Sequence, residues 1–261
     1  MIGEPPLLDA HEIVVTYGGV TAVDRASLRV NPGEIVALIG PNGAGKTSMF
    51  NALAGVIRPA SGRIRFRGRD LSGYSPHERA RLGMARTFQH VNLYGRLTVR
   101  DNLVLSHFIE GRGGLVSSLL GGATARADRR LANARAEELI DSIGLDHIAD
   151  LPCSELPYGM QRLVSVARAL AVTPRLLMLD EPSAGLGPGE SEQLGGMIEA
   201  IRDRMRIPVL LIEHDMSLVM SISDHLYVLD FGVPLAQGSP DEVRKDPRVI
   251  AAYLGDDAVV R

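Results

Sequence analysis

Short, continuous apolar runs recur along the chain, and each ends in a polar or glycine-rich turn. Runs of this kind, without alternation, are typical of strands that are buried on both faces of a sheet. In the last third of the sequence, segments with helical spacing separate them, at 189–205 and 216–222. Strands that alternate with helices predict an α/β fold with a mainly parallel sheet. The predicted core strands follow the turn at 31–33 or cover 175–180, 208–213 and 226–229.

The first ninety residues read differently, because their strands are shorter and more polar. Residues 12–15, 26–30 and 63–66 predict an antiparallel β subdomain with turns at 17–19 and 31–33. Helices are expected at 47–54, closed by Gly55, and from Pro76 to near Gly83, with a strand at 84–90. After the turn at Phe231 and Gly232, two short closing helices are expected within 240–247 and 249–255.

Helical spacing dominates residues 98–173, which we interpret as an α-helical subdomain inserted into a single domain spanning 1–261. One helix is predicted at 126–143, stopped by Gly144. The preceding segment, 111–127, is rich in Gly, Ala and Ser and contains a small apolar cluster. It is either a loop with one helical turn or a contact surface for a membrane partner.

The apolar run from Ile35 leads into the glycine-rich sequence GPNGAGKTS, which matches the phosphate-loop pattern G-x-x-x-x-G-K-[ST]. Glycines let backbone N–H groups approach a triphosphate, and the next helix presents its positive end to the same anion. The lysine reaches the β- and γ-phosphates, and the threonine hydroxyl can bind Mg²⁺. The predicted ATP-binding residues are Gly40, Pro41, Asn42, Gly43, Ala44, Gly45, Lys46, Thr47 and Ser48.

Two carboxylates follow the apolar run LLML, at the end of a predicted parallel strand, where α/β sheets bind ligands. Asp180 is expected to hold Mg²⁺, usually through water. Glu181 is expected to act as the general base that activates the attacking water. Alone, an apolar run before Asp-Glu could be a helix cap, but a complete phosphate loop in the same chain favours the catalytic interpretation.

Three further side chains are predicted to reach the same site. His214 ends the next apolar strand and could donate a hydrogen bond to the γ-phosphate or order the water. Gln89 lies at the exit of the predicted strand 84–90, where its amide oxygen could bind Mg²⁺ or water. Tyr17 ends a predicted strand and could stack on adenine.

A helix with a regular apolar face is predicted after Gly159, and its N-terminus could meet a phosphate. The alternative is an ordinary buried helix. The candidate phosphate-contacting segment is Leu156, Pro157, Tyr158, Gly159 and Met160.

Composition limits the remaining possibilities. The chain has 261 residues, 45% of them hydrophobic, and a formal net charge of -3, which argues against a nucleic-acid partner. Its single cysteine excludes an internal disulfide or a cysteine-based metal site and suits a reducing cytosol. The N-terminal residues lack an export signal, and the apolar runs are too short to span a membrane. If the protein serves transport, another chain must supply the channel.

Taken together, the motifs GPNGAGKT, RTFQH, LPYGMQR, LMLDEPSAGL, LLIEHDMSLVM and AYLG resemble those of an ABC transporter ATP-binding subunit, from about residue 8 to 255. The last two motifs make the chain most similar to the LivG type, the ATPases of branched-chain amino acid importers. The resemblance places Tyr17 at the aromatic A-loop, Gln89 at the Q-loop and residues 183–186 at the D-loop.

This resemblance implies that two ATPase subunits enclose two Mg²⁺-bound ATP molecules, each held by one chain's phosphate loop and the other's signature segment. It also implies two membrane permease subunits near the Q-loop, an extracytoplasmic substrate-binding protein and a location at the cytoplasmic face of the cell membrane. The second ATPase is expected to be a different chain, although the isolated subunit could form a homodimer.

The signature segment departs from the family pattern, which is LSGGQ in general and usually resembles LAYGQ in the branched-chain group. Here Pro157 supplies no amide, and the serine hydroxyl that contacts the γ-phosphate is absent. We therefore predict that contact depends on the Gly159 amide and the helix N-terminus, and that the site completed by this segment is the weaker of the pair.

Other members of the superfamily share the architecture, so a lipopolysaccharide-exporter ATPase or a urea or amide importer subunit stays open at this point. A nucleic-acid-associated ABC ATPase would need a coiled-coil insertion, a second cassette or a basic face. A non-catalytic nucleotide-binding switch is the remaining alternative, suggested by the altered signature.

Overall fold

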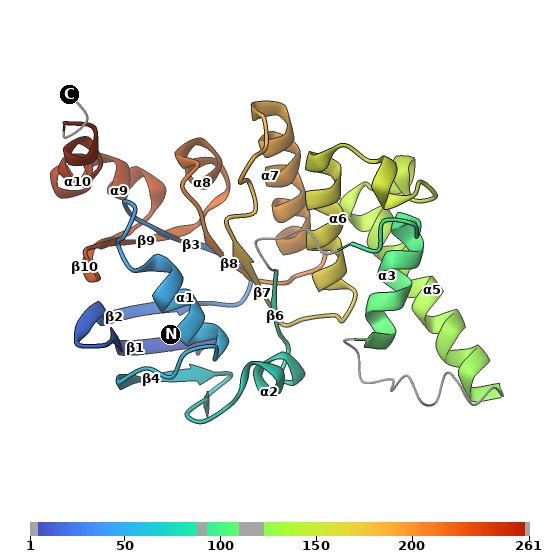
Figure 1. The fold of residues 1–261 in the computed structure, drawn as a ribbon, viewed down its shortest axis with the longest axis horizontal. Helices are drawn as coiled ribbons and strands as arrows, with labels where there is room; N and C mark the ends of the chain where they lie inside the picture. The colour runs from blue at the N-terminus through green and yellow to red at the C-terminus, as the bar shows by residue number, and fades with distance from the viewer. Residues whose placement is uncertain (1–4, 88–92, 110–122, 259–261) are drawn as a thin grey trace.

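The computed structural model describes residues 5–87, 93–109 and 123–258, which form two sheets with helices around them (Figure 1). The strands are β1 (Leu8–Tyr17), β2 (Val20–Val30), β3 (Ile35–Ile39), β4 (Ser61–Phe66), β5 (Arg69–Asp70), β6 (Met84–Arg86), β7 (Leu176–Asp180), β8 (Val209–Ile212), β9 (His225–Asp230) and β10 (Val233–Gly238). The helices are α1 (Lys46–Ala54), α2 (Pro76–Arg81), α3 (Val99–Ile109), α5 (Ala123–Ile143), α6 (Tyr158–Leu170), α7 (Pro188–Asp203), α8 (Met216–Ile222), α9 (Pro240–Lys245) and α10 (Pro247–Ala258), with 3₁₀ turns η1 (Asp146–Ile148) and η2 (Cys153–Glu155).

The larger sheet has the strand order β10-β9-β3-β8-β7-β6, and every neighbouring pair except β10-β9 is parallel. The prediction of a mainly parallel core is therefore confirmed. All five residues of β3 are buried, and its two faces serve different cores. Ile35, Ala37 and Ile39 pack in the cluster that contains α6, α7 and α8, whereas Val36 and Leu38 pack with α1 and the second sheet. This two-sided burial explains why the core strands read as unbroken apolar runs.

The smaller sheet is antiparallel, with the order β2-β1-β4-β5. Helix α1 lies between this sheet and the larger one, as Figure 1 shows, and its buried Phe50 and Leu53 join the shared core. The two sheets and their connections agree with the α/β cassette architecture and with the predicted antiparallel β subdomain.

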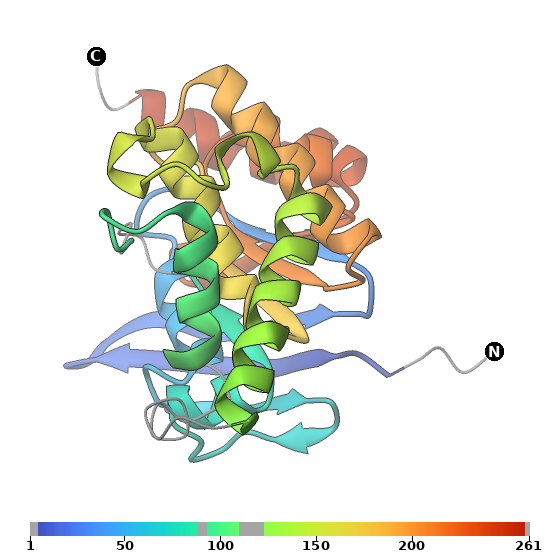
Figure 2. The ribbon, with the colours of Figure 1, turned by 90° about the vertical axis from the view of Figure 1, so that its right-hand side faces the viewer.

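Between residues 98 and 173 the described part of the chain contains α3, α5, α6 and the two 3₁₀ turns, but no strand longer than the isolated bridge Thr98–Pro152. Figure 2 places α3 and α5 side by side on the face opposite the β9-β10 end of the molecule. Helix α6 packs against both of them and also against β6 and β7. We propose that residues 98–173 form the inserted subdomain, with α6 as its link to the core.

The structure differs from the sequence-based prediction at several boundaries. Residues 233–238, which carried no predicted element, form β10, because the turn at Phe231 and Gly232 is a hairpin that returns along β9. The strand predicted at 84–90 covers 84–86 among the described residues, and α5 begins at Ala123, before the predicted start. Residues 110–122, most of the segment considered as a membrane-partner surface, lie outside the described residues. Among the helices that are described, none has the length and hydrophobicity needed to span a membrane.

Candidate functional site

The phosphate loop joins β3 to α1, so a buried strand and a helix N-terminus fix its two ends. Gly45 is the N-cap of α1 and has a φ of 89°, in the left-handed region. A Cβ atom at Gly40 would lie 2.1 Å from the Leu229 carbonyl oxygen, and one at Gly45 would lie 2.2 Å from that of Ala22. Neighbouring backbone therefore excludes any side chain at either position, which keeps the loop tight enough for its amides to approach an anion.

The ammonium group of Lys46 is buried within this loop. It donates hydrogen bonds to the carbonyl oxygens of Gly40 at 2.7 Å and Pro41 at 2.9 Å. Burial lowers the pKa of Lys46, while the negative charge of nearby Glu181 opposes that change. An ammonium has three donors, so the third is available to a phosphate oxygen. The predicted lysine and the predicted base are thus close enough to interact electrostatically.

Tyr17 ends β1, as predicted, and is 47% exposed. Its hydroxyl donates to Ser48 Oγ at 3.4 Å, which links the β1-β2 hairpin to the first turn of α1. An exposed ring held beside the phosphate loop offers a flat apolar surface that suits an aromatic base.

Asp180 ends β7 and is only 2% exposed, so its carboxylate needs partners within the protein. Arg86 at the end of β6 supplies one, with an ion pair of 2.8 Å to Oδ2. The same guanidinium donates to Asn51 Oδ1 at 2.8 Å and lies over the Phe50 ring. The Asp180 Oδ1 atom is buried and has no hydrogen-bond partner. Arg86 and Asn51 were not among the predicted site residues.

Glu181 follows directly and adopts a left-handed φ of 46°, which is uncommon for a residue with a side chain. Its amide donates to the Ile212 carbonyl oxygen at 3.0 Å, and its own carbonyl oxygen accepts from Arg162 at 3.3 Å. These bonds to β8 and α6 hold the backbone of Glu181 in its turned conformation. The adjacent carboxylates therefore differ in burial, since Asp180 is buried and Glu181 is partly exposed.

His214 lies two residues past the end of β8, and its side chain is 59% exposed. The buried carboxylate of Glu213 accepts hydrogen bonds from the backbone amides of His214 at 3.0 Å and Ser183 at 2.7 Å. Glu213 therefore connects the start of the predicted D-loop to the predicted histidine. Its role was missed because the sequence shows it only as the last residue of an apolar run.

Three further residues predicted for the site are Thr47, Gln89 and Gly159. Thr47 lies in the first turn of α1 and is exposed. Gln89 lies outside the described residues. Helix α6 begins at Tyr158, so Gly159 lies in its first turn rather than before it.

The signature segment packs against the start of α7. Gly159 is buried, and a Cβ atom there would lie 2.1 Å from Glu190 Oε1. The other oxygen of Glu190 accepts a hydrogen bond from the Gly187 amide at 2.9 Å and caps α7. Tyr158 is 51% exposed, beside Gly185 of the predicted D-loop region. The signature segment thus packs against the start of α7, and its Tyr158 lies beside the predicted D-loop.

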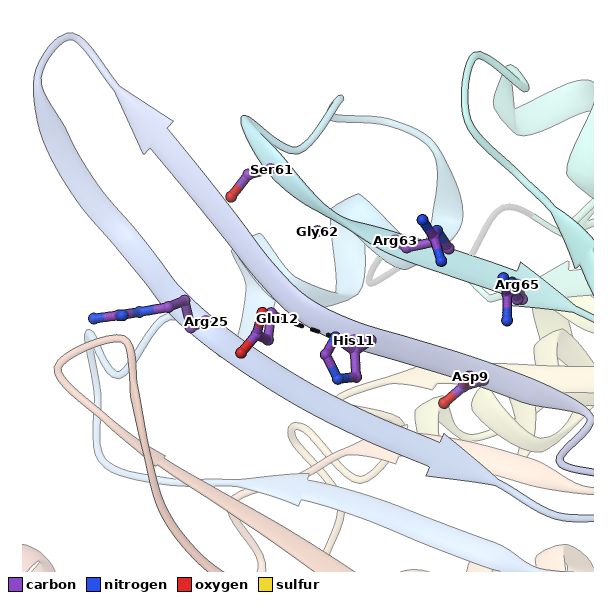
Figure 3. Close-up of a pocket in the computed structure, with 8 residues that line it drawn as sticks. All are labelled: Asp9, His11, Glu12, Arg25, Ser61, Gly62, Arg63 and Arg65. Carbon is purple, nitrogen blue, oxygen red and sulfur yellow. Dashed lines mark ion pairs between the residues drawn. The ribbon is translucent and has the colours of Figure 1, made fainter.

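A charged concavity of about 510 Å³ lies elsewhere, on the outer face of the antiparallel sheet (Figure 3). Its lining includes Asp9, His11, Glu12 and Arg63 and none of the predicted nucleotide-binding residues. These side chains are mainly exposed and project from β1 and β4 toward solvent. This concavity is therefore separate from the predicted nucleotide-binding residues, which lie on the phosphate loop and at strand ends.

The phosphate loop, the buried lysine and the carboxylates at the end of a parallel strand together define a P-loop nucleotide-binding domain. The family model for ABC transporters matches residues 23–184. The chain belongs to that family and is one of its ATP-binding, ATP-hydrolysing cassettes.

Within that family it falls in the LivG type. A model described as branched-chain amino acid ATP-binding cassette transporter matches residues 233–259. LivG of Salmonella typhimurium, a high-affinity branched-chain amino acid transport ATP-binding protein, is 45% identical and covers 96% of this chain and 98% of its own length. BraF of Pseudomonas aeruginosa, which has the same description, is 41% identical with the same coverage. A solved ABC transporter cassette in its ADP conformation is 29% identical, with a TM-score of 0.81, and covers 97% of this chain and 100% of its own.

Proposed function

We propose that this chain powers the uptake of branched-chain amino acids across a cell membrane by hydrolysing ATP. The observation that carries the proposal is the similarity to LivG and BraF over 96% of the chain, together with the C-terminal match at 233–259. The urea-importer alternative is tested directly by the transport assay described below.

In the proposed mechanism, the loop 40–45 and the N-terminus of α1 cradle the phosphates, and Lys46 moves from loop carbonyls to the β- and γ-phosphate oxygens. Tyr17 stacks on the base. Glu181 accepts the proton of the attacking water, and His214 orients that water or the γ-phosphate. Gln89 would link this site to the membrane subunits. Support comes from the burial of Lys46 and from the charge of Glu181 acting on it.

Mg²⁺ fits the residues present. Within the described ranges, His, Cys, Asp and Glu form no cluster of three or more that could bind an ion by themselves. Mg²⁺ commonly uses one or two protein groups together with substrate phosphates and water. Asp180, with its buried unpartnered Oδ1, and Thr47 would supply those protein groups. When bound, the ion would neutralise charge that develops on the phosphates.

We further propose that the chain works as a pair with a second ATPase subunit, on two membrane permeases at the cytoplasmic face of the membrane and with an extracytoplasmic binding protein. The segment 156–160 would complete the nucleotide site of the partner. Its packing on Glu190 and Gly185 supports a coupled movement of the signature and the D-loop.

A transport assay tests this proposal. The native complex is reconstituted in liposomes, and ATP-dependent uptake of radiolabelled leucine and urea is compared, with Glu181→Gln as the hydrolysis-deficient control. Leucine uptake that requires ATP and is lost in the control is expected. ATP-driven uptake of urea without leucine uptake would contradict the proposed substrate class.

A further inference from the structure

Arg86 connects the two sides of the nucleotide site that are expected to meet a metal ion. It ends β6, and its side chain is 18% exposed. One nitrogen bonds Asn51 on α1 and another bonds Asp180 on β7, each at 2.8 Å. A single planar guanidinium can bridge two acceptors in this way because its donors are fixed in a fork.

Asn51 lies on α1, the helix that also carries Thr47, so its bond to Arg86 joins that helix to Asp180. Asn51 lies four residues after Thr47 on α1, so both side chains project from the same face of that helix. Thr47 and Asp180 are the two protein groups that would hold Mg²⁺ in the proposed function. By joining Asn51 to Asp180, Arg86 fixes the distance between the helix that carries Thr47 and the strand that carries Asp180.

The two carboxylate oxygens of Asp180 have different surroundings. Oδ2 is occupied by Arg86, whereas the buried Oδ1 has no partner. A buried carboxylate oxygen without a hydrogen bond is costly unless another group uses it. In this arrangement Arg86 holds the carboxylate through Oδ2, and Oδ1 would be available to an ion.

We propose that Arg86 is a positioning residue for the metal side of the nucleotide site. It does not touch the nucleotide; it acts through Asp180 and through the α1 face that bears Thr47. Residues that orient metal ligands in this way typically affect metal affinity strongly. The inference rests on the proposed use of Mg²⁺, and it assigns a role to Arg86, the first residue of the RTFQH motif, which was not among the predicted site residues.

The test measures metal binding rather than turnover. Mn²⁺, which reports by electron paramagnetic resonance, is titrated into the full-length chain with saturating ADP, for wild type, Arg86→Lys and Arg86→Gln. We expect Mn²⁺ affinity to fall about tenfold or more in both variants, while ADP affinity in EDTA is unchanged. Lysine keeps the charge but cannot bridge both acceptors, so its failure to rescue would identify geometry rather than charge as the cause.

Arg79 provides a matched control. This buried arginine from α2 donates to the carbonyl oxygens of Ala52 and Leu53 at the opposite end of α1. Arg79→Gln should lower the melting temperature without changing Mn²⁺ affinity in the folded protein. If neither Arg86 variant folds, Asn51→Ala, which removes one anchor only, should weaken Mn²⁺ binding in the same direction.

The outcomes separate the two proposals. A folded Arg86→Lys or Asn51→Ala protein that binds Mn²⁺ as tightly as wild type, or more tightly, would overturn the proposed role of Arg86. Failure of the wild-type chain to bind Mn²⁺ with ADP would instead overturn the proposed metal role.

Discussion

The phosphate loop and the signature segment prepare for nucleotide chemistry in different ways. Around the loop, the chain supplies a buried ammonium, a helix N-terminus and a nearby carboxylate, so the main groups are already assembled. The segment 156–160 instead offers an exposed tyrosine, a proline without an amide and a buried glycine packed on Glu190. The comparison suggests the proposal that the phosphate-loop side binds nucleotide largely by itself, whereas the segment 156–160 would need a second chain in order to act.

Of the substitutions that test this comparison, Lys46→Ala is expected to have the largest effect on nucleotide binding and turnover. Loss of the buried ammonium should abolish turnover and weaken ATP binding by about 1.5–3 kcal/mol, the range for hydrogen bonds to charged groups. Equilibrium binding of a fluorescent ATP analogue and a phosphate-release assay measure the two effects. Unchanged nucleotide affinity would contradict the phosphate role of the loop.

Glu181→Gln should separate binding from chemistry on the same side of the comparison. The amide preserves the shape of the side chain but cannot accept the proton, so hydrolysis should slow by about 10²- to 10⁴-fold. ATP binding should persist, and the closed dimer should accumulate, as measured by light scattering after gel filtration. Turnover close to wild type would remove Glu181 as the general base.

Tyr17→Ala should have a smaller effect, because it removes a stacking surface and leaves the phosphate contacts in place. Base stacking on an aromatic ring is worth about 1–3 kcal/mol, so ATP affinity should fall roughly tenfold. Tyr17→Phe keeps the ring and loses only the 3.4 Å bond to Ser48, and it is the matched control. Equal losses in both variants would argue against stacking.

Gly159→Ala tests the segment 156–160. It is expected to change the ATP affinity of the isolated chain less than the other substitutions. The added methyl group would displace Glu190 from its position at the start of α7, so stability should fall by about 0.5–2 kcal/mol, the typical cost of a lost cap. ATP affinity of the isolated chain should be unchanged, while hydrolysis by the assembled pair decreases. A weaker affinity in the isolated chain would show that the two regions are not independent.

Much of the fold follows from local patterns in the sequence. The apolar runs at 175–180 and 208–213 contain β7 and β8. Every residue of these two strands is buried, and short unbroken apolar runs are typical of strands covered on both faces. The strand β10 was missed, since its pattern VPLAQG is half exposed and contains a proline. Only its pairing with β9 defines it, and such pairing is not visible in a local window.

The candidate site was predictable where a motif carries its own chemistry. Lys46, Asp180 and Glu181 occupy the strand end and helix start that the sequence predicted. Arg86, Asn51 and Glu213 were not predicted as site residues, because their importance lies in contacts between elements distant in the sequence. A buried ion pair depends on which strands are neighbours, and the order β6-β7-β8 is a tertiary property.

The most direct measurement of the central claim is the experimental structure of the Glu181→Gln protein with ATP and Mg²⁺. The account predicts phosphates within hydrogen-bonding distance of Lys46 and the loop amides, the ion between Thr47 and Asp180, and the opposite chain's 156–160 segment at the γ-phosphate. A nucleotide bound away from Lys46, or a pair that closes without bringing the signature segment to the phosphates, would contradict it.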